Sequence, residues 1–212
     1  MATWSRELIT QLIEEGSWTA RAKALERLAT HFAEERLEEA ERHAVTDAFR
    51  IALYDAEPLV RRVLAESVKA APALPRDILL ALARDSAAVA APLLEHSRLL
   101  TEDDLLPIVA RGTTAHRLAI AARRLISARV ADALLSFGER SVILRLLAND
   151  GAAVSETALH RLLDEYPDTP AVTDGIAKRR LLPVSVGARL YGGVPALRSE
   201  ASRPRHRCAG LN

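Results

Sequence analysis

The residues best suited to chemistry in this sequence are basic side chains spaced along its second half. His116 and Arg123 are seven positions apart, so they are expected to share one face of a helix. Arg117 and Arg124 share the neighbouring face. On one side of a helical array, such groups would form a strip that holds an acidic protein segment or the phosphates of a nucleic acid. The predicted partner-binding residues are His116, Arg117, Arg123, Arg124, Arg145, Arg161 and Arg179.

The charge of the chain is distributed unevenly, which leaves three interpretations of this strip open. Residues 111–212 carry 16 Lys and Arg against 9 Asp and Glu, whereas residues 1–57 carry 7 against 12. An acidic protein or peptide is the first interpretation, and a nucleic acid is the alternative. Against a nucleic acid, no aromatic residues are interleaved for base stacking, and acidic residues interrupt the strip. In the third interpretation the arginines only face solvent or pair between helices.

Catalytic and metal chemistry find little support in the other residues. The acidic run Glu102–Asp104 suits a helix N-terminus, where free N–H groups and the helix dipole stabilise carboxylates. The six histidines show no metal-ligand spacing, and the single cysteine, Cys208, can form neither a disulfide framework nor a thiolate site. Ser127 and Ser155 occupy helix-capping positions with no nucleophile motif around them. We therefore expect no enzyme activity, no cofactor and no metal.

An internal repeat must position these residues. Five times, an apolar residue followed by Pro, Ser or Thr begins a short apolar helix, at intervals of 26, 26, 28 and 28 residues. A branched aliphatic residue follows eight positions after each start. Because helices of about ten residues do not persist alone in water, such units must stack on copies of themselves. The starts are Leu74-Pro75, Leu100-Thr101, Ile126-Ser127, Val154-Ser155 and Leu182-Pro183, and the aliphatic residues are Leu82, Ile108, Leu134, Leu162 and Leu190.

The sequence predicts an all-α protein in three parts. Residues 1–56 are predicted to form a three-helix cap, in which the apolar stripe of the third helix runs from Ala40 to Ile51. Residues 57–191 are predicted to form an α-solenoid of about five short two-helix repeats. Residues 192–212 are rich in Arg, Ser and Pro, and we expect a mobile basic tail there. Because that end lacks an evident cap, we also expect that the chain can associate with itself through it.

Composition favours a soluble cytoplasmic protein. Apolar residues make up 49% of the chain and aromatic residues only 4%, so Ala and Leu supply most of the apolar content, as is typical of close-packed short helices. The longest apolar run, Ala87–Leu94, has eight residues and is too short to span a membrane. The first residues lack the pattern of a secretory signal.

Several stretches resemble known helical repeats. Ala73–Asp85 is similar to the leucine-rich repeat variant, an all-helical bacterial repeat, while Val60–Arg62 and Leu64–Glu66 are similar to HEAT-type repeats. The order of segments over roughly residues 5–190 resembles a bacterial family catalogued as domain of unknown function 2336. This resemblance implies a HEAT-like helical array and supplies no catalytic residues, because the family is named for having no known activity. The matching stretches are Val89–Ser97, Leu100–Leu105, His116–Ala121 and Leu146–Ala152.

We therefore predict a non-enzymatic protein-interaction scaffold, in bacterial regulation or assembly, whose stacked second helices display a rigid surface to a peptide or helix. The alternative is a nucleic-acid-binding helical array that uses the basic half of the chain. A third hypothesis, a hydrolase or base-repair enzyme, would require a carboxylate and a basic cleft to converge in the folded chain.

Overall fold

The structure, a computed structural model, describes residues 3–14, 16–33 and 37–192. Within these residues it has 13 helices and no strand beyond one isolated bridge between Ile126 and Ala152. The predicted tail at 192–212 lies, after its first residue, outside the described residues. The helices are α1 (Thr3–Glu14), α2 (Trp18–Ala33), α3 (Glu39–Ala52), α4 (Pro58–Val68), α5 (Arg76–Ala83), α6 (Ala87–His96), α7 (Glu102–Arg111), α8 (Thr114–Ala121), α9 (Ala128–Leu135), α10 (Arg140–Leu147), α11 (Glu156–Glu165), α12 (Pro170–Ala177) and α13 (Val184–Tyr191).

None of the helices in the described part of the chain combines the length and the apolarity that crossing a membrane requires.

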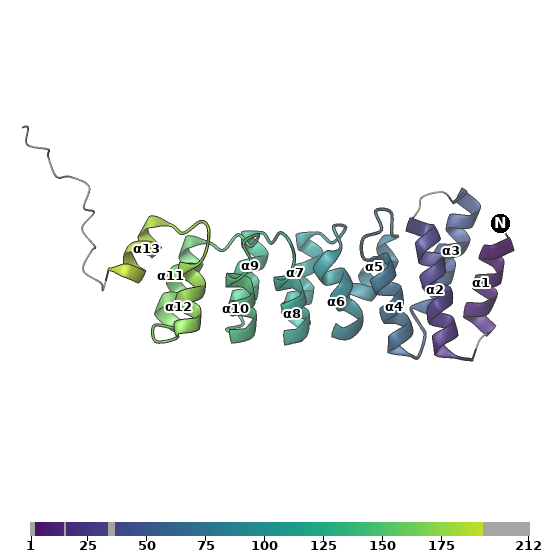
Figure 1. The fold of residues 1–212 in the computed structure, drawn as a ribbon, viewed down its shortest axis with the longest axis horizontal. Coiled ribbons are helices and arrows are strands. Elements are labelled where there is room, and N and C mark those ends of the chain that lie inside the picture. The colour runs from purple at the N-terminus through teal and green to yellow at the C-terminus, as the bar shows by residue number, and fades with distance from the viewer. Residues whose placement is uncertain (1–2, 15, 34–36, 193–212) are drawn as a thin grey trace, which may run out of the picture.

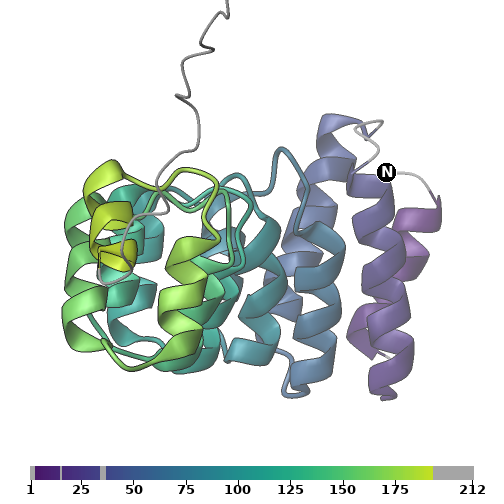
Figure 2. The same cartoon turned by 60° about the vertical axis from the view of Figure 1, so that its left-hand side comes forward.

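The helices stand side by side in a row of two layers that runs from α1 at one end to α13 at the other (Figure 1). The even-numbered helices from α2 to α12 form a continuous layer, in which each helix packs against the next even-numbered one. The odd-numbered helices from α5 onward form the other layer, and α5, α7, α9 and α11 each pack against the even-numbered helix that follows (Figure 2). Each of these odd-numbered helices therefore covers one even-numbered helix of the other layer.

The even-numbered layer is built on two apolar positions, one helical turn apart, that recur from helix to helix. The side chains at these positions are fully buried, and each contributes roughly 1.5–3 kcal/mol relative to an exposed side chain. In α8 the first position is taken by His116, and Ile120 holds the second. The aliphatic pairs elsewhere are Val60 with Leu64, Val89 with Leu93, Val142 with Leu146, and Val172 with Ile176.

The odd-numbered helices begin where the repeat predicts. The side-chain oxygens of Ser127 and Ser155 accept hydrogen bonds from backbone N–H groups in the first turns of α9 and α11. Thr101 and Asp104 form a capping box at the start of α7. Four of the five aliphatic residues are buried, and the fifth, Leu190 in α13, is partly buried. The residue before each helix is a predicted start: Pro75, Thr101, Ser127, Ser155 and Pro183.

The N-terminal helices form as predicted, but the buried face of α3 matches the expected stripe only in part. Ala40 is exposed and Ile51 is 50% exposed, whereas Val45 and Phe49 are buried. The ring of Phe49 packs edge to face on Phe32, with the ring centroids 5.5 Å apart. Ala48, in the middle of the expected stripe, is buried, but the two ends of the stripe at Ala40 and Ile51 are not, because turning Val45 and Phe49 inward removes more apolar surface from water.

Ion pairs and hydrogen bonds join neighbouring helices across the row. One set links the odd-numbered helices: Arg50–Asp77, Arg76–Asp104, Arg129–Asp103, Ser155–Asp132 and Arg189–Asp164. A second set links arginines in the fourth positions of α2, α4 and α8 to carboxylates in the turns that precede α4, α6 and α10. This set is Arg21–Asp55, Arg61–Asp85 and Arg117–Glu139. Many of the arginines in the sequence thus hold the fold together.

We expect the fold to lose stability as the pH falls below about 4. Hydrogen bonds from Arg61 and Arg21 lower the pKa of Asp85 and of Asp55, respectively. A carboxyl group whose pKa is lower in the folded state stabilises the fold above its unfolded pKa. That stabilisation is lost as the pH falls through the folded pKa. Thermal unfolding at pH 7 and pH 3 should give a lower midpoint at pH 3, with a smaller drop for Asp85→Asn; equal midpoints at both pH values would contradict this expectation.

Candidate functional site

His116 is buried in the first turn of α8, where both ring nitrogens bond to the backbone. Its Nδ1 accepts the N–H of Thr113 at 3.1 Å, and its Nε2 lies 2.9 Å from the carbonyl oxygen of Asp85. Because a carbonyl oxygen only accepts hydrogen bonds, Nε2 carries the proton and the ring is the neutral Nε2–H tautomer. The side chain joins α8 to the turn before α6, so it is not available to a partner.

Arg117 is also held inside the fold. Its Nε donates to the carbonyl oxygen of Val109 at 2.9 Å, and its Nη1 donates to Glu139 Oε1 at 2.8 Å. The guanidinium lies over the ring of Phe137, 3.6 Å from the ring centroid. Arg117 therefore connects α7 and α8 to the turn before α10, and it is 7% exposed.

Arg123 and Arg179 bind backbone carbonyls at the C-terminal ends of neighbouring helices. Arg123 donates to the carbonyl oxygens of Leu94 and Ser97, at 2.6 and 2.8 Å, where α6 ends. Arg179 donates to the carbonyl oxygen of Ala152 at 2.5 Å, in the turn after α10. The last carbonyls of a helix lack intrahelical donors and carry partial negative charge, so a cation there stabilises the helix end. Burial lowers the pKa of both arginines.

The seven predicted residues do not form one strip. The helix α8 ends at Ala121, so Arg123 lies beyond its last turn and His116 lies in its first turn. The expectation that these two residues share a helix face was therefore wrong, because the helix is shorter than the seven-residue spacing requires. Arg123 and Arg124, in contrast, line a common hollow.

The other predicted residues lie at the surface. Arg124 and Arg145 are exposed. Arg161 is exposed too, and its Nε lies 3.7 Å from Glu165 Oε1, one turn further along α11. An exposed pair of this kind contributes little to stability, about 0–1 kcal/mol.

The hollow beside Arg123 and Arg124 has a volume of about 800 Å³ and lies at the C-terminal ends of α6 and α8. A second hollow of about 250 Å³ adjoins it, and both are lined by Arg123 and Leu125. We call the two together the α6–α8 groove. The larger hollow is lined by Glu95, His96, Ser97, Arg98, Ala122, Arg123, Arg124 and Leu125. The smaller is lined by Leu100, Glu102, Leu105, Arg123, Leu125, Ile126, Ser127 and Val130.

The α6–α8 groove combines a basic part with an apolar part. Arg98 and Arg124 are exposed in the larger hollow, and Arg123 is half-buried between the two hollows. Leu125 is 74% exposed, and buried Leu100 lines the smaller hollow. This arrangement is suited to recognition: guanidinium groups donate to carboxylates, while the aliphatic side chains bind an apolar group.

Arg98 and Leu125 are groove residues that the sequence-based prediction missed. The signal that identifies them is the register of the even-numbered helices, which aligns Leu93 of α6 with Ile120 of α8. In that register the turn after α6 lies beside the turn after α8, and Arg98 is equivalent to Leu125. Both residues lie in turns and not on a helix face, so helical spacing between basic residues does not identify them.

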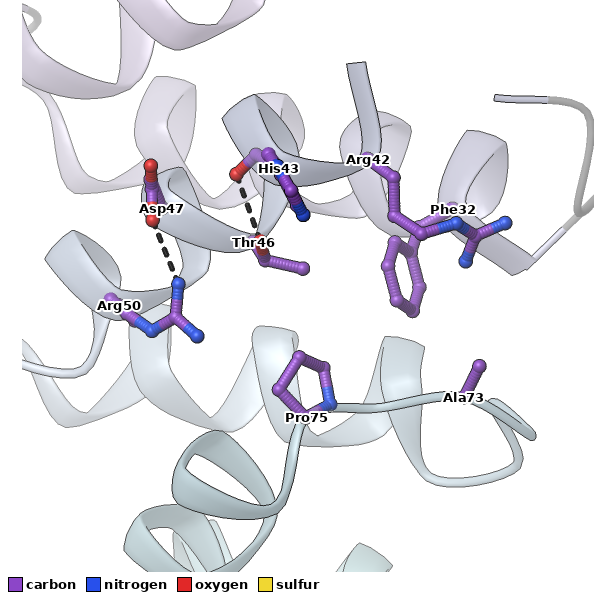
Figure 3. Close-up of a pocket in the computed structure, with 8 residues that line it drawn as sticks. All are labelled: Phe32, Arg42, His43, Thr46, Asp47, Arg50, Ala73 and Pro75. Atoms are coloured by element: carbon purple, nitrogen blue, oxygen red, sulfur yellow. Dashed lines mark hydrogen bonds and ion pairs between the residues drawn. The ribbon is translucent and has the colours of Figure 1, made fainter. Parts of the chain in front are cut away.

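Another hollow, of about 500 Å³, lies between α3 and the segment that precedes α5. In Figure 3, His43 and Arg50 of α3 face Pro75 across it. Arg50 is already paired with two carboxylates: its Nε lies 2.7 Å from Asp77 Oδ2, and its Nη1 lies 2.7 Å from Asp47 Oδ1. The second arginine of this hollow, Arg42, lies over the ring of Phe32, so among the described residues the hollow has one arginine outside an ion pair, whereas the larger hollow of the α6–α8 groove has three arginines.

In the part of the chain that the structure describes, no three His, Cys, Asp or Glu side chains are grouped so that they could hold a metal ion.

A protein-family model described as "Uncharacterised protein conserved in bacteria" matches residues 89–205. The match includes α6 and α8 and therefore both walls of the groove. No curated protein and no solved structure matches the chain.

Proposed function

We propose that this chain, which belongs to the uncharacterised bacterial family DUF2336, is a non-enzymatic scaffold that binds another protein through the α6–α8 groove. The fold beneath this proposal is a HEAT-like α-solenoid of five two-helix repeats behind a three-helix cap. The continuous packing of the even-numbered helices supports this reading, since each helix contacts chiefly its neighbours along the row.

The observation that carries the proposal is the pairing of exposed charge with exposed apolar surface at one hollow. Arg98 and Arg124 line the larger hollow together with Leu125, and the turns that hold them follow helices packed rigidly against each other. A rigid groove loses little conformational entropy when a partner binds, so its contacts translate into affinity. The carbonyl bonds of Arg123 hold the two turns at a fixed separation.

The test is an affinity capture from an extract of the source bacterium, with the full chain as bait. We expect a protein that the parent retains with and without nuclease, and that Arg98→Glu/Arg124→Glu loses. The matched control is Arg62→Glu/Arg140→Glu, which changes the charge equally at two exposed arginines outside the groove and should retain the protein. Retention that nuclease abolishes, with a steep salt dependence, would instead identify a nucleic acid as the partner. Equal retention by both double variants would contradict the role of the groove.

A further inference from the structure

We propose that the α6–α8 groove takes a short acidic segment of a partner protein, which places a branched aliphatic side chain against Leu125. This inference rests on the proposed scaffold function and specifies the chemistry of its partner.

The groove holds more positive charge than the fold neutralises. Arg123 binds carbonyl oxygens, and the described residues include no carboxylate that forms an ion pair with it. Burial accordingly lowers the pKa of Arg123, whereas the carboxylate of Asp85 raises the pKa of Arg61. Arg98 and Arg124 add two exposed guanidinium groups to the larger hollow, so the groove holds three arginines against two carboxylates, Glu95 in the larger hollow and Glu102 in the smaller. Carboxylates of a partner would therefore gain charge-assisted hydrogen bonds without displacing an internal ion pair.

The apolar part of the groove calls for an aliphatic group in the same segment. Leu125 is 74% exposed at the border of the two hollows, and Leu100, Leu105 and Ile126 form buried walls of the smaller one. An aliphatic side chain that enters the smaller hollow would cover Leu125 and remove both surfaces from water. The segment must therefore carry its acidic residues close to a Leu, Ile or Val.

Other occupants fit these observations less well. The lining residues include no Phe, Tyr or Trp, and His96 is their one ring on which a base could stack, which disfavours a single-stranded nucleic acid. A second copy could offer the apolar side chains at its C-terminal end, where Leu181 and Val184 are almost fully exposed. That end also carries Lys178 and Arg180, so it would bring positive charge to a positive groove.

The test is a selection of random 12-residue peptides, displayed on phage, against the immobilised full chain. We expect enriched peptides with two or more Asp or Glu close to a Leu, Ile or Val. In fluorescence anisotropy, Arg98→Glu/Arg124→Glu should weaken the binding of such a peptide by about tenfold or more, and the parent's affinity should fall as salt rises. Leu125→Ser should weaken it by roughly fivefold, because it removes the apolar contact. The control Arg62→Glu/Arg140→Glu should bind within about twofold of the parent.

Unchanged thermal midpoints show that the variants are folded. Enrichment of basic or uncharged peptides, no enrichment, or equal binding by Arg98→Glu/Arg124→Glu would overturn the inference.

The two proposals fail separately. If the extract partner is retained but no acidic peptide displaces it, the scaffold function stands and the acidic segment is wrong. If no protein is retained from the extract, the scaffold function fails whatever the peptides do.

Discussion

Gly151→Ala is expected to lower the free energy of unfolding by about 3 kcal/mol, because overpacking costs roughly 1–3 kcal/mol and each lost hydrogen bond costs about 1 kcal/mol more. A Cβ atom on Gly151 would lie 1.9 Å from the carbonyl oxygen of Arg124. The obstacle is backbone, so no side chain can rotate away to make room. The two segments are also bonded to each other: Ile126 N–H donates to the Gly151 carbonyl at 3.1 Å, and Ala153 N–H donates to the Ile126 carbonyl at 2.8 Å.

Gly16→Ala is the matched control for this substitution. Apart from its neighbours in the chain, no atom of the described residues lies within 4 Å of a Cβ atom built on Gly16. The control should therefore change stability by no more than about 0.5 kcal/mol. Urea unfolding of the two variants and the parent provides the measurement. A Gly151→Ala variant as stable as the Gly16→Ala variant would show that the two turns are not in contact as described.

The sequence predicted the positions of the helices well because the signal was periodic and local. The predicted starts of the repeats are the residues that directly precede α5, α7, α9, α11 and α13. They could be predicted because capping depends on the residue type at one position and on the turn that follows. Gly138, in the turn before α10, adopts a φ of +63°, a conformation that glycine reaches without strain. Local preferences of this kind can be predicted without knowing which helices pack against each other.

The candidate site was predicted poorly because the roles of arginines depend on contacts between distant segments. Arg117, Arg123 and Arg179 were grouped by charge and helical spacing. In the structure, their partners lie eight residues away for Val109 and 29 away for Leu94. Nothing in the local sequence distinguishes an arginine that binds carbonyls from one that faces solvent. The same lack of long-range information is why the buried face of α3 was predicted only in part.

Arg117→Ala is expected to lower the free energy of unfolding by about 2–4 kcal/mol, somewhat below the roughly 3–5 kcal/mol for a fully buried ion pair. The substitution removes a buried guanidinium that binds Val109 and Glu139 and stacks on Phe137. It also leaves the partly buried carboxylate of Glu139 without its arginine partner, and the Oε2 of that group has no hydrogen-bond partner among the described residues. The control is Arg129→Ala, whose pair with Asp103 has side chains 63% and 83% exposed and should matter by less than about 1 kcal/mol.

A second substitution separates the two causes of this loss. In Arg117→Ala/Glu139→Gln the unpaired carboxylate is replaced by a neutral amide, so part of the lost stability should return in urea unfolding. If Arg117 instead served a partner, as its charge and spacing first indicated, Arg117→Ala would leave the free energy of unfolding near that of Arg129→Ala and would weaken binding of the acidic peptide. The fold predicts instead that Arg117→Ala lowers the free energy of unfolding much more than Arg129→Ala does. Arg117 donates its hydrogen bonds to Val109 and Glu139, whereas Arg98 and Arg124 line the groove.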